Sequence, residues 1–114
     1  VPVVDGEVKF KGKVGDDVDV ATAAQAARAC ALNIIAQVKA ACDGDLDRVN
    51  RCIRLGGFIN ATADFTEQPQ VINGASDLLV EIFGDAGRHA RFAVGAGSLP
   101  LGVAVEIDAI FEIS

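Results

Sequence analysis

Residues 88–111 read RHARFAVGAGSLPLGVAVEIDAIF, and this stretch decides the fold of the 114-residue chain. It contains two runs with the alternating pattern of β-strands, about 90–96 and 103–113. The Gly- and Pro-containing segment 97–102 separates them, which indicates a turn or loop. An arginine, Arg91, stands at the entrance of the first run, although most of the stretch is apolar. The question for function is why a permanently charged side chain lies in this strand.

Pairing the two runs as an antiparallel hairpin places Arg91 opposite Asp108 and Ala93 opposite Glu106. Since side chains alternate along a strand, one face of the sheet then holds Arg91, Ala93, Gly95, Ala104, Glu106 and Asp108. The other face is predicted to be core, formed by Phe92, Val94, Val103, Val105, Ile107, Ala109 and Phe111. The charged face thus combines one arginine and two acids with a floor of very small residues.

Two interpretations of Arg91 stay open at this point. In the first, Arg91 forms a surface ion pair with Asp108 or Glu106, worth less than about 1 kcal/mol. In the second, Ala93 and Gly95 leave room for a ligand whose carboxylate Arg91 binds through two parallel hydrogen bonds. A solvated strand face normally carries Lys, Thr or Gln rather than Ala and Gly, which favours the pocket. A neighbouring acidic side chain would then hold or polarise water.

Two helical patterns precede this stretch. A period of 3.6 residues, with Asp19 as N-cap and Gly44 at its end, indicates a long, Ala-rich first helix. Thr66 opens a second pattern, which has Pro69 near its first turn. Gly84 follows its last apolar residue and closes it. The small side chains of the first helix suit close packing on a sheet.

Alternation in segment 46–59 predicts a strand with one polar face, although Arg51 interrupts the pattern. The pair Gly56-Gly57 within it indicates a bulge or a close backbone approach. Segment 1–15 has room for one short strand. The order strand, helix, strand, helix, strand, strand predicts an α+β domain with two helices on one face of a mixed sheet. With 114 residues, the chain is expected to form one domain.

The composition disfavours several classes of partner. The net charge is −6 and the pI is near 4.5, which disfavours binding to a phosphate backbone. Six Phe, with no Trp or Tyr, leave few stacking surfaces for single-stranded nucleic acid. No apolar run approaches the roughly 18 residues that cross a bilayer. We therefore expect neither a nucleic-acid partner nor a membrane.

The cysteines and the histidine form no metal-binding motif. Cys30, Cys42 and Cys52 include no CxxC pair, and His89 is the single histidine, so the sequence predicts no metal site. An odd number of cysteines without a disulfide framework indicates reduced thiols and a cytoplasmic protein. Cys30 and Cys42 fall in the first helical pattern, where we interpret them as small core residues.

Several short stretches resemble the YjgF/YER057c/UK114 family, also called RidA. The clearest is the closing block, with Ala90-Arg91 on one strand, Leu99-Pro100 in the loop and Val105-Glu106-Ile107-Asp108-Ala109-Ile110 after it. Weaker matches are Ala24-Gln25-Ala26-Ala27 in the first helix, Gly57-Phe58 with Asp64-Phe65 after the middle strand, and Ile72-Asn73-Gly74-Ala75. The resemblance covers residues 20–113 approximately.

The resemblance implies a fold similar to chorismate mutase, assembled as a homotrimer with sites in the clefts between subunits. Family members have two further N-terminal strands, which include a tyrosine and a Ser-Gly-Gln stretch, and this chain has no tyrosine. We therefore expect residues 1–114 to be a single RidA-like domain that lacks those strands. Ala93 stands where typical members have a cysteine, and four extra residues separate Phe65 from Asn73. These departures imply a divergent subgroup.

The resemblance also implies a set of site residues. Arg91 falls on the arginine that clasps the substrate carboxylate, and Glu106 falls on the glutamate that places the hydrolytic water. Asn73 falls near an asparagine of the second helix, and Phe58 falls on a residue that lines the cleft from the neighbouring subunit. The backbone amide of Ala93 is available to bind substrate. Arg91 and Glu106 are thus the expected catalytic pair, with the other three in substrate binding.

The activity implied is the hydrolysis of reactive 2-enamine or 2-imine acids to 2-keto acids and ammonia, with no metal or organic cofactor. The partner is then a small imino or keto acid. A different class, a trimeric binding protein for keto or amino acids, would use the same arginine without turnover. Endoribonuclease activity, attached to some family members, is the less favoured alternative, because the chain is acidic and His89 alone is available for acid-base work.

Overall fold

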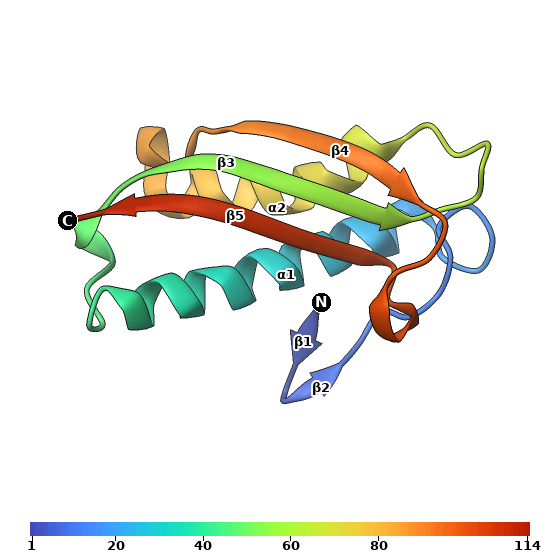
Figure 1. Cartoon of the computed structure of the whole chain (residues 1–114), viewed down its shortest axis with the longest axis horizontal. Helices are drawn as coiled ribbons and strands as arrows, with labels where there is room; N and C mark the ends of the chain where they lie inside the picture. Colours follow the sequence, from blue (N-terminus) through green and yellow to red (C-terminus); the bar gives the residue numbers. More distant parts are fainter.

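Two helices lie against one face of a three-stranded sheet in the computed structural model, which describes residues 1–114 (Figure 1). The main elements are β1 (Val3–Val4), β2 (Glu7–Val8), α1 (Val20–Ala41), β3 (Val49–Asn60), α2 (Gln68–Phe83), β4 (Ala90–Ala96) and β5 (Val105–Ile113). Three short 3-10 helices join them: η1 (Leu46–Arg48), η2 (Gly84–Gly87) and η3 (Pro100–Gly102). The predicted α+β class with both helices on one face of a mixed sheet is confirmed. β1 and β2 form a small hairpin of their own, where the sequence predicts one short strand.

Helix α1 begins where the sequence indicates, whereas α2 begins at Gln68, two residues after the predicted Thr66. The Asp19 carboxylate caps α1 by accepting the N–H of Thr22 at 2.7 Å, and this bond lowers the pKa of Asp19. Beyond the end of α1, Gly44 has a φ of 88°, a conformation that favours glycine. Pro69 lies in the first turn of α2, and Gly84 follows its last residue. The end signals in the sequence therefore locate both helices to within a few residues.

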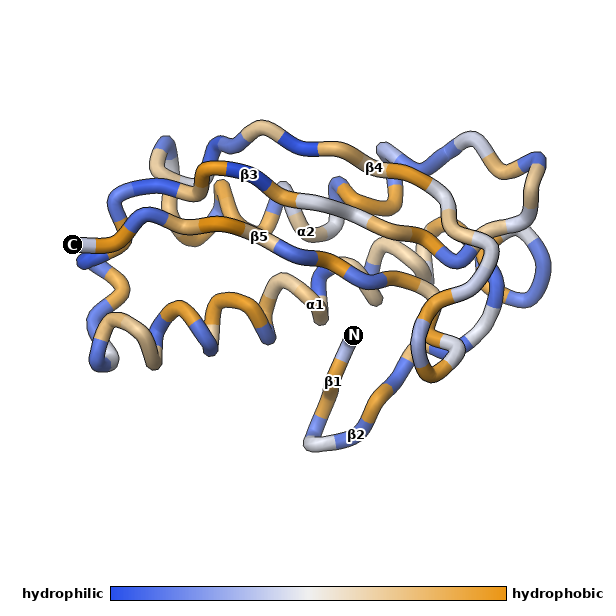
Figure 2. The backbone as a smooth tube through the Cα atoms, viewed as in Figure 1, coloured by the Kyte–Doolittle hydropathy of each residue, from blue (hydrophilic) through white to orange (hydrophobic).

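Small residues let α1 pack closely on α2 and on the sheet. A side chain at Gly74 of α2 would meet the backbone carbonyl of Ala24 in α1. The largest fully buried side chains of the core between helices and sheet are Leu55, Ile59, Ile72 and Leu79. Figure 2 shows apolar and polar residues alternating along the first part of β5, as expected for a strand with one covered face, whereas the second half of β3 carries few polar residues. Neither helix combines the length and hydropathy that a membrane-spanning helix requires.

The hairpin predicted for the last two strands is wrong, because β3 lies between them. β3 pairs in parallel with β4, where Gly57 is the partner of Ala93, and antiparallel with β5, where Gly57 is the partner of Ile107. The cause is the α2 crossover, which brings β4 beside β3 in the parallel direction. The chain then passes the end of β3 through η3, where Leu101 has a φ of 61°, and returns as β5 on the other side (Figure 1).

This topology also corrects which residues share a face. Arg91, Ala93 and Gly95 lie on one face, as predicted, and it is the face on which α2 packs. Glu106 and Asp108, which the hairpin places beside them, lie on the opposite side of the sheet, where no helix packs. Within one subunit, Arg91 therefore faces neither acid. The ion pair considered from the sequence does not form in this structure.

The apolar strip predicted as core is divided between the two faces. Val105 and Ile107 of β5 are buried under the helices, as predicted. Phe92 and Val94 of β4 lie instead on the helix-free face, where the ring of Phe92 packs edge-on against Phe58 with centroids 5.3 Å apart. Alternation separates the two faces of a strand, but both faces of β4 carry apolar residues. The pattern therefore does not identify which face is covered.

The irregular part of β3 explains why Arg51 interrupts its pattern. The register with β5 shifts on both sides of this residue, so the alternation of buried and exposed positions changes phase there. The predicted close approach at Gly56-Gly57 is confirmed. A Cβ on Gly56 would lie 2.5 Å from Asp108 Oδ1, and a Cβ on Gly57 would lie 2.5 Å from Ile72 Cδ1.

Candidate functional site

Arg91 lies near the start of β4, on the edge of the sheet, and its guanidinium reaches α2. Nη1 donates to Ser76 Oγ at 3.1 Å, and Nη2 donates to the carbonyl oxygen of Pro69 at 3.4 Å. These two bonds hold the guanidinium on the α2 side of the strand. Because a guanidinium has five N–H donors, the remaining donors are free for a ligand.

This guanidinium lines an open polar cavity of about 280 Å³. Its lining consists of Asn73, Ser76, Val80, Arg88, His89 and Arg91. The structure thus brings Asn73 and Arg91, two residues expected at the site, to one cavity between α2 and the start of β4. Arg88 adds a second guanidinium, whose Nε donates to Asp85 Oδ1 at 3.2 Å. Two guanidinium groups suit a small anionic ligand.

Ser76 and His89 are cavity residues that the sequence did not assign to this site. Ser76 Oγ and His89 Nε2 are 2.8 Å apart, and His89 Nδ1 lies 2.6 Å from the carbonyl oxygen of Gly87. Ser76 follows Asn73 by three residues, so both side chains lie on the same side of α2. That spacing is the signal by which Ser76 could have been found from the sequence.

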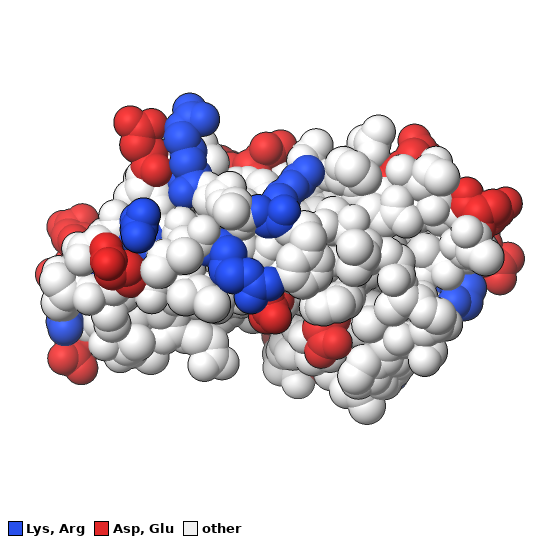
Figure 3. All heavy atoms as spheres, turned by 45° about the horizontal axis from the view of Figure 1, so that its top comes forward, with Lys and Arg blue, Asp and Glu red and all other residues white.

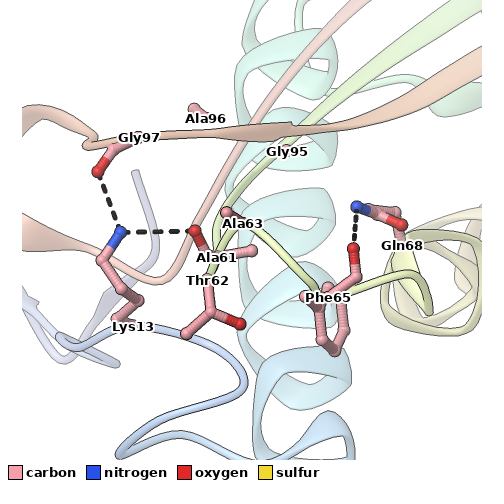
Figure 4. A pocket seen from close by; sticks show the side chains of 9 residues that line it. All are labelled: Lys13, Ala61, Thr62, Ala63, Phe65, Gln68, Gly95, Ala96 and Gly97. Atoms are coloured by element: carbon pink, nitrogen blue, oxygen red, sulfur yellow. Dashed lines mark hydrogen bonds between the residues drawn. The ribbon is translucent and has the colours of Figure 1, made fainter.

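A larger cavity, of about 650 Å³, opens farther along β4. Gly95 belongs to its wall, with Phe65 and Gln68 on one side and Lys13 on the other (Figure 4). The Lys13 ammonium donates to the carbonyl oxygen of Gly97 at 2.9 Å, which holds the N-terminal segment beside the end of β4. Of the two small residues that follow the arginine on its own face, Gly95 therefore borders open space, whereas Ala93 lines neither cavity and packs against the core.

Glu106 and Phe58 lie on the helix-free face of the sheet, where they are register partners on β5 and β3. Both are half-buried. Beside them, Arg54 Nη1 lies 3.9 Å from Asp108 Oδ1, and the Arg54 guanidinium lies 5.2 Å from the centre of the Phe92 ring. One subunit thus separates the expected site residues into two groups, with Arg91, Ala93 and Asn73 on the helix side and Glu106 and Phe58 on the other.

Positive charge gathers over β3 and β4 although the chain is acidic. Figure 3 shows Lys and Arg side chains grouped on this part of the surface, with acidic side chains mostly around the group. The arginines on or next to these strands are Arg48, Arg51, Arg54, Arg88 and Arg91. All of them except Arg91 have a carboxylate oxygen within 3.9 Å, so Arg91 is the arginine of this group without an acidic partner.

The three cysteines are unpaired and buried. Burial raises the pKa of the Cys30 thiol to about 11, and it raises the pKa of the Cys52 thiol to about 11 as well. Because the thiolate is the reactive form, such thiols are poor nucleophiles at neutral pH. The structure brings no three His, Cys, Asp or Glu side chains together as a group of metal ligands.

A mixed sheet with two helices on one face, and an arginine-lined cavity at its parallel edge strand, defines a protein of the chorismate mutase-like class. The chain belongs to the YjgF family: residues 1–112 match the family model described as "YjgF/chorismate mutase-like, putative endoribonuclease". The family and the fold inferred from the closing block of the sequence are confirmed.

Three relatives match most of the chain. The protein Atu1372 from Agrobacterium tumefaciens, whose function is unknown, is 54% identical with a TM-score of 0.97, over 99% of this chain and 71% of that one. A structure from Shewanella oneidensis, described as a "putative endoribonuclease", is 38% identical with a TM-score of 0.93, over 98% of this chain and 74% of that one. Protein TCP17 from Trypanosoma cruzi is 51% identical over 104 residues, or 90% of this chain. The match spans 64% of the length of TCP17.

Proposed function

We propose that the protein hydrolyses 2-imine or 2-enamine acids to 2-keto acids and ammonia. The observation that carries the proposal is the position of Arg91, whose guanidinium α2 holds in a polar cavity at the sheet edge. A planar guanidinium binds a carboxylate through two parallel hydrogen bonds. Asn73 lines the same cavity and offers an amide to the nitrogen end of the substrate. A 2-imino acid has the matching groups, a carboxylate next to a C=N bond.

The chemistry requires one base and one anchor. Arg91 fixes the carboxylate and stabilises the charge that develops during the reaction. Glu106 takes a proton from water as the water oxygen attacks the imine carbon, and the C=N bond becomes a single bond. Glu106 passes this proton to the nitrogen and then transfers the proton of the new hydroxyl group to the nitrogen as well. The C–N bond breaks, ammonia leaves, and the C–O bond becomes the keto group. One water molecule is consumed, and no electrons are transferred.

Because Arg91 and Glu106 lie on opposite faces of one sheet, we place them in different subunits of a homotrimer. Each cleft would combine Arg91, Ala93 and Asn73 of one subunit with Glu106 and Phe58 of the next. The helix-free face supports this arrangement, because Val94 and Ile110 are 42% and 47% exposed on it. Apolar surface of this kind favours association with another subunit.

Arg91→Ala tests the assignment of the anchor. The loss of hydrogen bonds to a charged group is expected to lower kcat/KM about 10- to 150-fold. Arg91 is exposed, so the melting temperature should stay close to that of the wild type. Arg91→Lys is expected to fail as well, because an ammonium group does not reproduce the planar fork.

The measurement is ammonia release from imines that an amino-acid oxidase generates in the assay, corrected for spontaneous hydrolysis. Arg28→Ala is a matched control, because Arg28 is an exposed arginine on α1 that pairs with Glu81 at 3.6 Å, away from the cavity. Normal turnover in a folded Arg91→Ala protein would contradict the site.

A binding protein without turnover is the alternative use of the same cavity. It predicts that 2-oxobutyrate binds in a calorimetric titration and that Arg91→Ala weakens this binding, whereas ammonia release never exceeds the spontaneous rate. We favour the enzyme because Glu106 offers a base that carboxylate binding alone does not require. An RNA substrate is disfavoured by the net charge of −6 and by the absence of Trp and Tyr.

A further inference from the structure

Ser76 and His89 form a hydrogen-bonded pair whose proton positions follow from their partners. The carbonyl oxygen of Gly87 can only accept, so His89 Nδ1, 2.6 Å away, carries the ring proton. In the neutral imidazole, Nε2 is then an acceptor, and the Ser76 hydroxyl, 2.8 Å away, donates to it. A serine that donates to an imidazole whose other nitrogen is held in place is the arrangement of a nucleophile and its general base.

The surrounding structure holds this pair in position. Gly87 is buried, and a side chain on it would meet the backbone carbonyl of Leu79, so η2 packs directly against α2. The carbonyl that orients His89 is therefore fixed relative to the helix that carries Ser76. A serine within a helix commonly bonds the carbonyl four residues before it. Ser76 instead bonds His89 and Arg91, which come from outside its helix.

Positive groups around Ser76 favour loss of its proton and stabilise an oxyanion. Arg91 Nη1 donates to Ser76 Oγ at 3.1 Å, and Arg88 lines the same cavity of about 280 Å³. A guanidinium next to a hydroxyl oxygen stabilises the developing alkoxide. The Asn73 amide lines the cavity one helical turn away and can donate to a carbonyl oxygen that becomes negative.

We propose that Ser76 and His89 are the nucleophile and general base of a second activity, the cleavage of small esters that carry a carboxylate. Ser76 Oγ attacks the ester carbonyl carbon while His89 Nε2 takes the hydroxyl proton. The bond from the carbonyl carbon to the alcohol oxygen breaks, and His89 gives that proton to the leaving alcohol. Water then attacks the acyl group on Ser76, His89 takes and returns its proton, and the acid and free serine are released. This activity does not depend on imine hydrolysis by the same protein.

A fluorophosphonate probe tests whether Ser76 is nucleophilic. Ser76 Oγ displaces fluoride from phosphorus and remains covalently labelled, so peptide mass mapping identifies the modified residue. The other two serines, Ser98 and Ser114, are internal controls. We expect labelling at Ser76, slowed on the order of 100-fold in His89→Gln, and unchanged in Ser98→Ala. A wild-type protein that is not labelled at Ser76, or a His89→Gln protein labelled at the same rate, would overturn the proposal.

Ester hydrolysis tests the substrate class. We expect 4-nitrophenyl hemisuccinate to be cleaved about tenfold faster than the uncharged 4-nitrophenyl butyrate, because the two guanidinium groups attract its free carboxylate. An initial burst of nitrophenol, with a succinyl group on Ser76 by mass spectrometry, is expected in the wild type and absent in Ser76→Ala. If the bonds only tie α2 to β4, Ser76→Ala lowers the melting temperature but leaves the hydrolysis rate unchanged. That result, like a wild-type rate equal to that of free imidazole, would refute the activity.

Discussion

Two inactive variants should restore each other if each cleft combines Arg91 of one subunit with Glu106 of the next. Arg91→Ala removes the carboxylate anchor, and Glu106→Gln removes the base while keeping the size of the side chain. A trimer of either variant alone has a defect in every cleft. Mixed trimers, obtained by co-expressing both variants in equal amounts, contain clefts that take an intact Arg91 from one subunit and an intact Glu106 from another.

The expected recovery follows from the geometry of the sheet, which separates Arg91 and Glu106 on opposite faces. A cleft is intact when the Glu106→Gln subunit provides the arginine and the Arg91→Ala subunit provides the glutamate. With random assembly, each condition holds for half of the subunits, so about a quarter of the clefts are intact. The preparation should therefore show about a quarter of the wild-type kcat with an unchanged KM. A site contained within one subunit predicts no recovery.

The assay is ammonia release at equal total protein, with the trimer fraction measured by sedimentation. A second mixture, of wild type with the double variant Arg91→Ala/Glu106→Gln, serves as control. If the site is divided between subunits, this mixture should show about a quarter of the wild-type activity, because both subunits that form a cleft must be wild type. A site within one subunit predicts about half of the wild-type activity. Absence of recovery in correctly assembled mixed trimers would refute the division of the site.

Three further predictions concern stability and reactivity. Gly74→Ala should lower the free energy of unfolding by about 1–3 kcal/mol, because the new Cβ meets a backbone carbonyl of α1. This loss is expected although alanine has the better helix propensity. Gly97→Ala is the control: its Cβ lies in open space, so the free energy of unfolding, measured in the same denaturant titration, should change by no more than about 0.5 kcal/mol. At pH 8, Cys30 and Cys52 should react with a disulfide reagent about 100-fold more slowly in the folded protein than in denaturant, because their pKa of about 11 exceeds the ordinary 9.0 by two units. Asp19→Ala should lower the melting temperature at neutral pH. Because folding lowers the pKa of Asp19, the difference in melting temperature between the variant and the wild type should shrink as the pH falls through the pKa of Asp19 in the folded protein.

The helices and the family could be predicted from the sequence because their signals are local. Asp19 caps α1 through a bond to a residue three positions away, and Pro69 and Gly84 mark the two ends of α2 by their own backbone preferences. The closing block carries the family resemblance in continuous stretches. None of these inferences needs knowledge of which segments meet in space.

The order of the strands could not be predicted from the same signals. Whether β5 pairs with β4 or with β3 depends on the path of the chain through α2. This crossover places β4 parallel to β3, and no local sequence pattern indicates that pairing. A hairpin of β4 with β5 would place Glu106 on the face of Arg91 and Phe92 in the core, whereas both lie on the helix-free face. The role of Ser76 in the cavity could not be predicted either, because its hydrogen-bond partners His89 and Arg91 are 13 and 15 positions away in the sequence.

The helix-free face links assembly to catalysis in the proposed function. Arg54, Phe58 and Phe92 form a packed group there, and Gly56 lets Phe92 and Asp108 lie close over β3. This ordered and partly apolar surface is the one that carries Glu106, so a subunit that covers it also approaches the base. In the proposed mechanism, a lone subunit would have the Arg91 anchor on one side of the sheet and the Glu106 base on the other. Association would then create the site rather than only stabilise the fold, and the proposal accounts in this way for a glutamate that lies across the sheet from Arg91.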